Sequence, residues 1–183
     1  RFESSFKSVC CSSKWLPCHG LHYTGVSAFH TFLHCFKYFV LFDISTKQLA
    51  LIYLNEFESK SFIPFIDLYL TYNSGIAFGF LDLGHRLLSN LLTIVGICIV
   101  IYIFMLLNKE SESSKKLALS MIIGGALGNI FDRIPDGYVT DFFHLKTNEF
   151  SFFIFNPADA FITIGAVILI YLELFKRDHV SKS

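Results

Sequence analysis

Residues 87–107 contain no charged side chain, and this segment most narrowly limits what the chain can fold into. A helix needs roughly 20 mostly apolar residues to cross the hydrocarbon core of a bilayer, and the segment has that length. The composition agrees, because 53% of the 183 residues are hydrophobic and only 16% are charged. A soluble domain normally carries about a quarter charged residues. We therefore expect an integral membrane protein.

Three other apolar segments are predicted to span the membrane, near residues 26–42, 117–133 and 157–175. The segment at 26–42 is the most polar, because it contains two histidines and a lysine. The segment at 117–133 reaches spanning length only if the polar motif at its end lies within the membrane boundary. With residues 87–107, the sequence predicts four transmembrane helices.

The distribution of Lys and Arg predicts how these helices are oriented. Cytoplasmic connections carry an excess of basic residues close to the spans. The connection at 108–116 and the tail after residue 175 are both rich in them (Lys109, Lys115 and Lys116; Lys176, Arg177 and Lys182). The segments 43–86 and 132–156 contain fewer per residue. We expect both termini in the cytoplasm and these two segments on the outer side.

The domain organisation follows from the spans. We predict one membrane domain at residues 26–175, which includes an outer platform at 43–86. An N-terminal extension, 1–25, precedes this domain, and a cytoplasmic tail, 176–183, follows it. The extension contains five residues of metal-ligating type (Cys10, Cys11, Cys18, His19 and His22). They form no CxxC pair and match no zinc spacing, so we expect no metal site. The formal net charge of +0 argues against a nucleic-acid partner.

Polar residues cluster where two apolar segments meet the outer side. The stretch "GGALGNIFDRIPDGYVTDFFHL" at 124–145 contains five of them (Asn129, Asp132, Arg133, Asp136 and Asp141). Ionisable groups at membrane depth cost about 2.5–3.5 kcal/mol each on insertion scales. Such residues indicate a functional site, although each also has a structural interpretation. Asp136-Gly137, for example, is typical of a turn.

The stretch "FNPADAF" at 155–161 allows two interpretations. Asn156 at the N-cap, Pro157 at the first position and Asp159 at the third are typical of a helix start. In the second interpretation, Asp159 is an acid at the outer end of an apolar segment and belongs to a functional site. Gly124 and Gly128 have the small-xxx-small spacing of close helix packing. That packing would bring their helix against a neighbour, such as the helix that begins near residue 158.

Two acids on converging segments indicate one chemistry. Asp141 lies in the alternating aromatic stretch "YVTDFFHL", where an apolar surface would raise its pKa. Two carboxyl groups about 3 Å apart share a proton, so that one acts as base and the other as acid. Such a pair hydrolyses peptides without a metal or a covalent intermediate. A serine or cysteine nucleophile lacks a supporting context here, and the chain contains neither a Walker loop nor HExxH.

Five blocks, in order along residues 43–175, resemble the lipoprotein signal peptidases (signal peptidase II), which are bacterial aspartic peptidases. The blocks are "DISTK" at 43–47, "YNSGIAFGF" at 72–80, "GGALGNIFDR" at 124–133, "GYVTDF" at 137–142 and "FNPADAFITIG" at 155–165. The resemblance implies a helical membrane protein with four transmembrane helices. A small β-sheet platform and a short amphipathic helix would lie on the outer surface, between the first two spans.

The resemblance further implies that the chain cleaves prolipoproteins just before a diacylglyceryl-modified cysteine. It assigns catalysis to Asp141 and Asp159, with Asp132 as a competitor for the role of Asp141. The supporting or substrate-binding positions would be Asn73, Gly75, Asn129, Asp132, Arg133 and Asn156, with Asp43 and Lys47 supporting the structure. The family implies no cofactor, contact with membrane lipids, a monomer and the bacterial inner membrane.

Two other functions compete with this one. A small transporter or assembly factor would use the acids for proton or ion passage, but transporters show paired repeats or polar residues in mid-span. Residues 87–107 carry no charge in mid-span, and the acids gather at one face. A catalytically inactive relative that serves as a binding protein is the other alternative. Each expected catalytic position is filled, which favours the enzyme.

Overall fold

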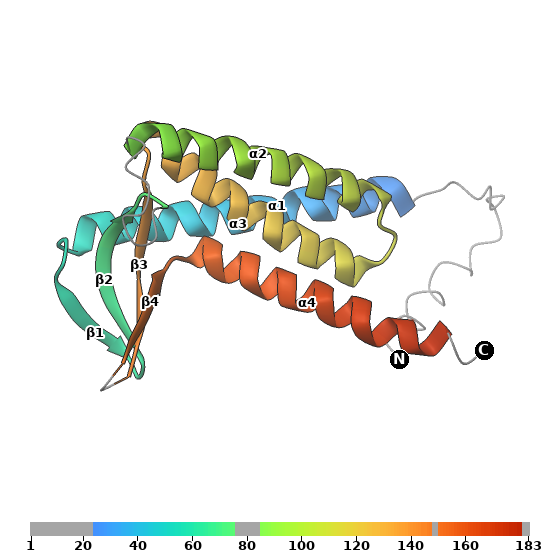
Figure 1. The fold of residues 1–183 in the computed structure, drawn as a ribbon. Coiled ribbons are helices and arrows are strands. Elements are labelled where there is room, and N and C mark those ends of the chain that lie inside the picture. Colours follow the sequence, from blue (N-terminus) through green and yellow to red (C-terminus); the bar gives the residue numbers. More distant parts are fainter. Residues whose placement is uncertain (1–23, 76–84, 148–149, 181–183) are drawn as a thin grey trace, which may run out of the picture.

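Four long helices lie side by side, and a small sheet covers one end of them (Figure 1). The computed structural model describes residues 24–75, 85–147 and 150–180. The elements follow the chain as α1 (Thr24–Tyr53), β1 (Ser59–Ile63), β2 (Ile66–Asn73), α2 (His85–Lys109), α3 (Ser113–Asp136), β3 (Val139–Lys146), β4 (Ser151–Phe155) and α4 (Pro157–Val180).

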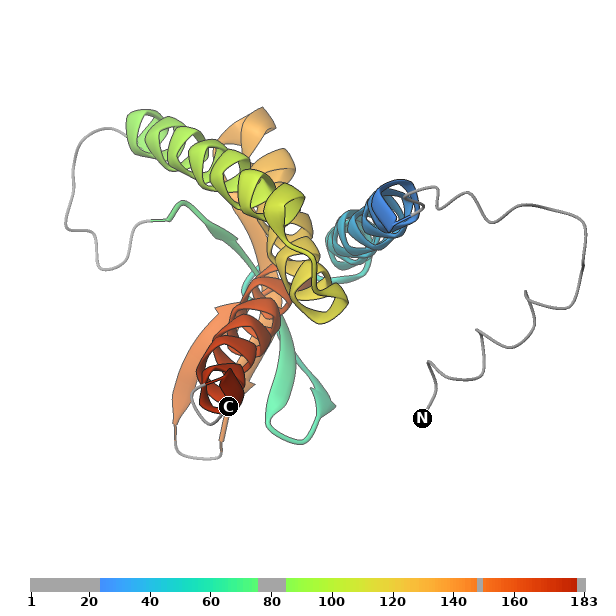
Figure 2. The ribbon, with the colours of Figure 1, turned by 90° about the vertical axis from the view of Figure 1, so that its right-hand side faces the viewer.

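Helix α3 is the centre of the bundle and contacts α1, α2 and α4 (Figure 2). Glycines let it approach its neighbours closely. A Cβ atom built on Gly124 would lie 2.7 Å from Cβ of Phe39 on α1, and one on Gly125 would collide with the carbonyl oxygen of Ala158 on α4. Gly165 makes the reciprocal approach from α4, toward the carbonyl oxygen of Ala118. The predicted packing of the glycine-bearing helix against the helix that begins near residue 158 is therefore confirmed.

The sheet is antiparallel, with the strand order β1-β2-β3-β4. At one end of the central pair Asn73 is opposite Val139, close to the helices, and at the other end Ile66 is opposite Leu145. The sequence interpretation placed the platform at 43–86 only. The structure adds β3 and β4, from the connection between α3 and α4, so half of the sheet comes from a second segment.

Helices α2, α3 and α4 contain stretches that are long and apolar enough to cross a membrane, at Arg86–Lys109, Ser113–Asp136 and Pro157–Phe175. These stretches coincide with three of the predicted spans and extend beyond two of them. Within its described residues α1 does not meet the same criterion. It also continues to Tyr53, well past the predicted limit at residue 42.

The continuation of α1 has a clear cause. Val40, Asp43, Lys47 and Ala50 are all buried, and their spacing places them on one face of the helix. Asp43 and Lys47 therefore lie on the face of α1 that packs into the bundle. The sequence interpretation took these two charges as the end of the span, because it could not show that they are neutralised inside the protein.

The segment after α3 turns as predicted at Asp136-Gly137. Gly137 has a φ of 91°, and its N–H donates to the carbonyl oxygen of Arg133. Its own carbonyl oxygen accepts a hydrogen bond of 2.7 Å from Ser89 Oγ on α2. The turn leads directly into β3, and so it fixes where the acid of that strand lies.

Some expectations concern residues outside the described ranges. The candidate metal ligands at residues 10–22 and most of the proposed extension lie there. Between α1 and α2 the described residues form the β1–β2 hairpin without a helix, and residues 76–84 of this connection are outside the description. The short amphipathic helix therefore stays a prediction. Helix α4 continues to Val180, into the segment expected to be a tail.

Candidate active site

Asp141 lies on β3, where the sheet meets the helices, and only 2% of its surface is exposed. Its Oδ1 accepts a hydrogen bond of 2.6 Å from Nδ2 of Asn156, and its Oδ2 accepts one of 2.9 Å from Nδ2 of Asn73. Burial raises the pKa of Asp141 to about 6, although the bond from Asn73 opposes the rise. The charge of Asp159 adds to it. A carboxyl group with this pKa is suited to proton exchange near neutral pH.

Asp159 lies in the first turn of α4 and takes part in a capping box. Its N–H donates to Oδ1 of Asn156 over 3.1 Å, while its Oδ2 accepts from the N–H of Asn156 over 3.2 Å. These two bonds confirm the helix-start interpretation. Of the two carboxyl oxygens of Asp159, only Oδ2 takes part in the capping box. The other, Oδ1, accepts a hydrogen bond of 2.8 Å from Nδ2 of Asn129 on α3. Asp159 is thus both a capping residue and part of the polar cluster.

Asn156 brings the two acids together. It is fully buried between the end of β4 and the start of α4, and it contacts both carboxyl groups. Because the two acids come from different elements, neither strand nor helix alone could place them side by side. A pair of adjacent carboxyl groups around one proton can activate water and protonate a leaving group.

Lys47 is the buried cation of the cluster, with 2% of its surface exposed. Its ammonium lies 2.8 Å from Oδ2 of Asp43 and 3.3 Å from Oδ2 of Asp132, and it donates to Oδ1 of Asn129 over 2.9 Å. Asp43 in turn accepts a hydrogen bond of 2.9 Å from the N–H of Ala158. These contacts join α1, α3 and the start of α4, so the support predicted for Asp43 and Lys47 has a definite geometry.

Asp132 occupies a different position from Asp141. Its Oδ2 accepts a bond of 2.7 Å from the N–H of Thr140, and its Oδ1 lies 3.3 Å from Oγ1 of the same residue. Successive side chains of a strand point to opposite faces, so Thr140 and Asp141 face apart. The cation paired with Asp132 is Lys47 on α1. The structure therefore separates the two competing acids.

Arg133 and Gly75 lie on the Asn73 side of the site. Gly75 has a φ of 81°, and its N–H donates to Oδ1 of Asn73 over 2.7 Å. A Cβ atom on Gly75 would lie 3.6 Å from Nη2 of Arg133, so the guanidinium approaches this turn. Among the described residues, the buried Nε of Arg133 has no hydrogen-bond partner. Arg133 therefore brings a positive charge and a free donor to the acids.

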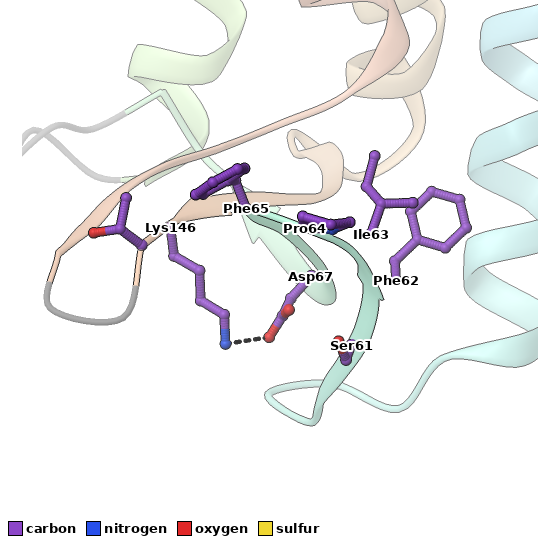
Figure 3. A pocket seen from close by; sticks show the side chains of 8 residues that line it. Ser61, Phe62, Ile63, Pro64, Phe65, Asp67 and Lys146 are labelled. Atoms are coloured by element: carbon purple, nitrogen blue, oxygen red, sulfur yellow. Dashed lines mark ion pairs between the residues drawn. The ribbon is translucent and has the colours of Figure 1, made fainter.

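Two hollows flank the sheet. One, of about 590 Å³, is lined by Tyr72, Asp132 and Thr140, on the face of β3 opposite Asp141. The other, of about 530 Å³, lies at the far ends of the hairpins, where Lys146 pairs with Asp67 beside Phe62 and Phe65 (Figure 3). The register places that end several residue pairs away from Asp141. The second hollow is therefore separate from Asp141 and Asp159.

The sequence interpretation did not identify three contacts of the site: the bonds from Thr140 to Asp132, from Ala158 to Asp43 and from Lys47 to Asn129. Two of them use backbone N–H groups, which carry no residue-specific signal. The third joins residues 82 positions apart. Thr140 could have been found only from the period of the strand, as the residue facing away from its neighbouring acid.

Comparisons with known proteins identify the family to which the chain is similar. The family model described as "Signal peptidase (SPase) II" matches residues 35–175. The chain is 41% identical to the lipoprotein signal peptidase of Pelagibacter ubique, over 74% of this chain and 82% of that one. It is 38% identical to the lipoprotein signal peptidase of Acinetobacter baylyi, over 74% and 77% of the two chains. These matches confirm the resemblance inferred from the five blocks.

Two solved structures of a bacterial membrane enzyme, determined by the in meso method, share the fold. The structure at 2.3 Å resolution is 28% identical and covers 84% of this chain and 92% of its own, with a TM-score of 0.69. The structure at 1.9 Å resolution is 30% identical and covers 79% and 93%, with a TM-score of 0.67. The bundle and its sheet are therefore the architecture of an integral membrane enzyme.

Proposed function

Because this chain belongs to the signal peptidase II family, we propose that it removes signal peptides from prolipoproteins and that Asp141 and Asp159 carry out the hydrolysis. The observation that supports this most directly is the pair of acids joined by Asn156 at one end of a membrane bundle. Asp132 is assigned a supporting role, since it pairs with Lys47 and Thr140 on the other face of β3.

The proposed reaction is that of an aspartic peptidase. The pair holds one proton. The ionised carboxylate takes a proton from a water molecule, which attacks the scissile carbonyl carbon, while the protonated acid gives its proton to the carbonyl oxygen. The tetrahedral intermediate then collapses as the leaving nitrogen receives the proton from the first acid and the second acid recovers its own. Both acids end as they began, so the cycle needs no further reagent.

The neighbouring residues support this chemistry in different ways. Asn73, Asn129 and Asn156 donate to the two acids and fix their orientation. The positive charge of Arg133 interacts with Asp141 and Asp159 and stabilises the negative charge that the pair carries. Gly75 lets the chain turn so that its N–H holds Asn73. Asp43 and Lys47 anchor the start of α4 to α1 and α3.

The finer assignments concern the substrate and the membrane. We propose cleavage before a diacylglyceryl-modified cysteine, and the position of the acids at the end of an apolar bundle suits a substrate held in the bilayer by its lipid. The enzyme acts as a monomer surrounded by membrane lipids in the bacterial inner membrane. Residues 26–175 form the peptidase domain, preceded by an extension and followed by a cytoplasmic tail.

Orientation is part of the proposal. We place the α2–α3 connection and both termini in the cytoplasm, with four spans and the sheet on the outer side. Figure 1 agrees with this arrangement, because the sheet lies at the opposite end of the bundle from the α2–α3 connection. In a background without other cysteines, a label at position 112 should report the cytoplasm and one at position 60 the outer side. The reverse pattern would place the acids on the wrong face for exported substrates.

A cleavage assay tests the proposed function directly. Purified protein is incubated with a lipidated prolipoprotein, and the loss of the signal peptide is followed as a shift on a gel. The same precursor without its diacylglyceryl group serves as the matched substrate. We expect rapid cleavage of the lipidated form alone. Absence of cleavage by well-folded protein would refute the peptidase function, and equal cleavage of both forms would refute the lipid requirement.

A further inference from the structure

Each of the three asparagines around the acids has its amide orientation fixed by a partner that can only donate. Oδ1 of Asn73 accepts from the N–H of Gly75, and Oδ1 of Asn156 accepts from the N–H of Asp159. Oδ1 of Asn129 accepts from the ammonium of Lys47. An exchange of the oxygen and nitrogen atoms would set an NH₂ group against another donor. All three side chains must therefore present their NH₂ groups to carboxyl oxygens.

The three donors differ in charge. Asn73 and Asn156 are held by neutral backbone groups and donate to Asp141. Asn129 is held by a buried cation and donates to Asp159. A charge on one side of an amide polarises it and strengthens the hydrogen bond that it donates on the other side. Asp159 therefore receives the strongest of these side-chain donors.

Other features favour the same asymmetry. Asp159 lies in the first turn of α4, where the helix dipole stabilises a negative charge, and its second oxygen accepts the N–H of Asn156. Asp141 lies on a strand, which has no comparable dipole, and it is almost completely buried. The other charged groups that surround the pair are Asp43 and Lys47 on α1 and Asp132 and Arg133 on α3.

On the basis of the function proposed above, we propose that Lys47 is a positioning residue that acts through Asn129 to keep the negative charge of the acid pair on Asp159. Asp159 is then the base that takes the proton from water, and Asp141 is the acid that protonates the scissile carbonyl oxygen. Lys47 never touches the substrate. Asp43 and Asp132 hold its ammonium in place, which explains why a cation is buried there.

Dependence of the rate on pH separates the two acids. In the profile of kcat/KM, the acidic limb reports the base and the basic limb reports the acid. Asn129→Leu removes the donor to Asp159, so the acidic limb should shift to higher pH by about one to two pH units. Asn73→Leu is the matched control, because it removes the equivalent donor to Asp141. It should raise the basic limb by a similar amount and leave the acidic limb in place.

The role of Lys47 is tested with Lys47→Met alone and combined with Asn129→Leu. If Lys47 acts through Asn129, the single variant shifts the acidic limb and the combination shifts it no further than Asn129→Leu does. Should Lys47→Met leave too little folded protein, Lys47→Met/Asp43→Asn replaces it. The amide that this second change introduces keeps an acceptor for the N–H of Ala158 and leaves no buried carboxylate at position 43, while Asp132, the other partner of Lys47, is partly exposed to water.

Three results would overturn the inference. In the first, Asn129→Leu moves the basic limb and Asn73→Leu the acidic one, which exchanges the roles of the acids. In the second, the shifts of Lys47→Met and Asn129→Leu add, so that Lys47 acts directly on the pair. In the third, Lys47→Met leaves both limbs unchanged. None of them affects the proposed cleavage of prolipoproteins, which is tested separately with the unaltered protein.

Discussion

Helices α2 and α3 are neighbours of almost equal length, 25 and 24 residues, yet they relate to their surroundings in opposite ways. Along the most apolar 18 residues of each helix, 6% of the residues of α2 are buried in the protein, whereas 44% of those of α3 are buried. Helix α2 therefore presents most of its surface to lipid. Helix α3 is enclosed by three other helices and contributes Asn129, Asp132 and Arg133 to the site.

The difference shows how a membrane enzyme divides its work between helices. A helix that faces lipid must be apolar on most sides, because polar groups there lack partners. A helix enclosed by protein can carry polar groups, because its neighbours supply the partners. Of the two helices, the less apolar one therefore supplies polar groups that surround the acids of β3 and α4. If this comparison holds, substitutions on the polar side of α3 and on α2 should have very different consequences.

The largest contrast should be in activity. Asp141→Asn and Asp159→Asn preserve the size of the side chains but abolish proton exchange, so each should lower the single-turnover rate by at least 10²–10⁴-fold. Each new amide turns its NH₂ group toward a group that can only donate, so thermal stability in detergent should fall moderately while the protein stays folded. Ile97→Val, on the exposed side of α2, is the control and should cleave normally.

The same experiment with Asp132→Asn decides between the competing acids. If this variant folds normally and is inactive while Asp141→Asn cleaves at the normal rate, Asp132 takes the place of Asp141 in the pair. The comparison between helices would then become sharper still, because α3 would itself supply a catalytic group.

Two glycines give the next contrast, this time in stability. Gly125→Ala on α3 places a methyl group against the carbonyl oxygen of Ala158, which is backbone and cannot move aside. We expect a loss of about 3 kcal/mol. In Gly96→Ala on α2 the new methyl group meets Cδ1 of Ile130 at 3.3 Å, a flexible side chain, so stability should stay nearly constant. Equal melting temperatures in detergent for the two variants would contradict the comparison.

Asp132→Asn should have a smaller effect on stability. The change removes one of the two carboxylates that neutralise Lys47, and the cation keeps Asp43 as its partner. The side chain of Asp132 is 21% exposed, so water offsets part of the loss. We expect a cost of about 2 kcal/mol, measured by denaturant titration in mixed micelles. Asp136→Asn is a suitable control, because Asp136 is exposed at the end of the same helix. A cost as small as that of the control would show that Lys47 does not depend on Asp132.

The smallest expected effect is a dependence of stability on pH. Folding raises the pKa of Asp141 from 3.8 to about 6, so the folded state binds the proton more tightly than the unfolded state does. Its contribution is fully present below the unfolded pKa and is lost as the pH rises through about 6. Between pH 5 and 7 this amounts to about 1 kcal/mol. Asp141→Asn should lack this part of the slope, and an unchanged slope would show that Asp141 does not titrate in that range.

The sequence predicted the lipid-facing parts of the molecule better than the enclosed ones. Residues 87–107 were recognised because an uncharged apolar segment of that length has one interpretation, and α2 contains them. The predicted first span ends at residue 42, before Asp43 and Lys47, whereas helix α1 continues past both because they are enclosed within the bundle. Strand β4, "SFFIF", gave no period-2 signal and was not predicted.

The candidate site was predicted in its members but not in its connections. Several acids lie at the ends of apolar segments, the family resemblance assigned catalysis to Asp141 and Asp159 among them, and the structure joins these two through Asn156. The partner of Asp132 was not found, since Lys47 lies on another helix and only the tertiary packing brings the two together. Local patterns identify which residues are unusual, whereas the contacts between them depend on how the helices pack.

The hydrogen bond from the N–H of Ala158 to Asp43 joins residues 115 positions apart, on the last helix and the first. It therefore has a consequence for biosynthesis. While the chain is being made, Asp43 emerges early with Lys47 one helical turn away, and the two can neutralise each other during insertion. The acceptor on Asp43 stays unused until α4 arrives, and the same helix brings Asp159. A partly synthesised chain thus lacks both this hydrogen bond and Asp159, so the polar cluster is completed only after the start of α4 has been made.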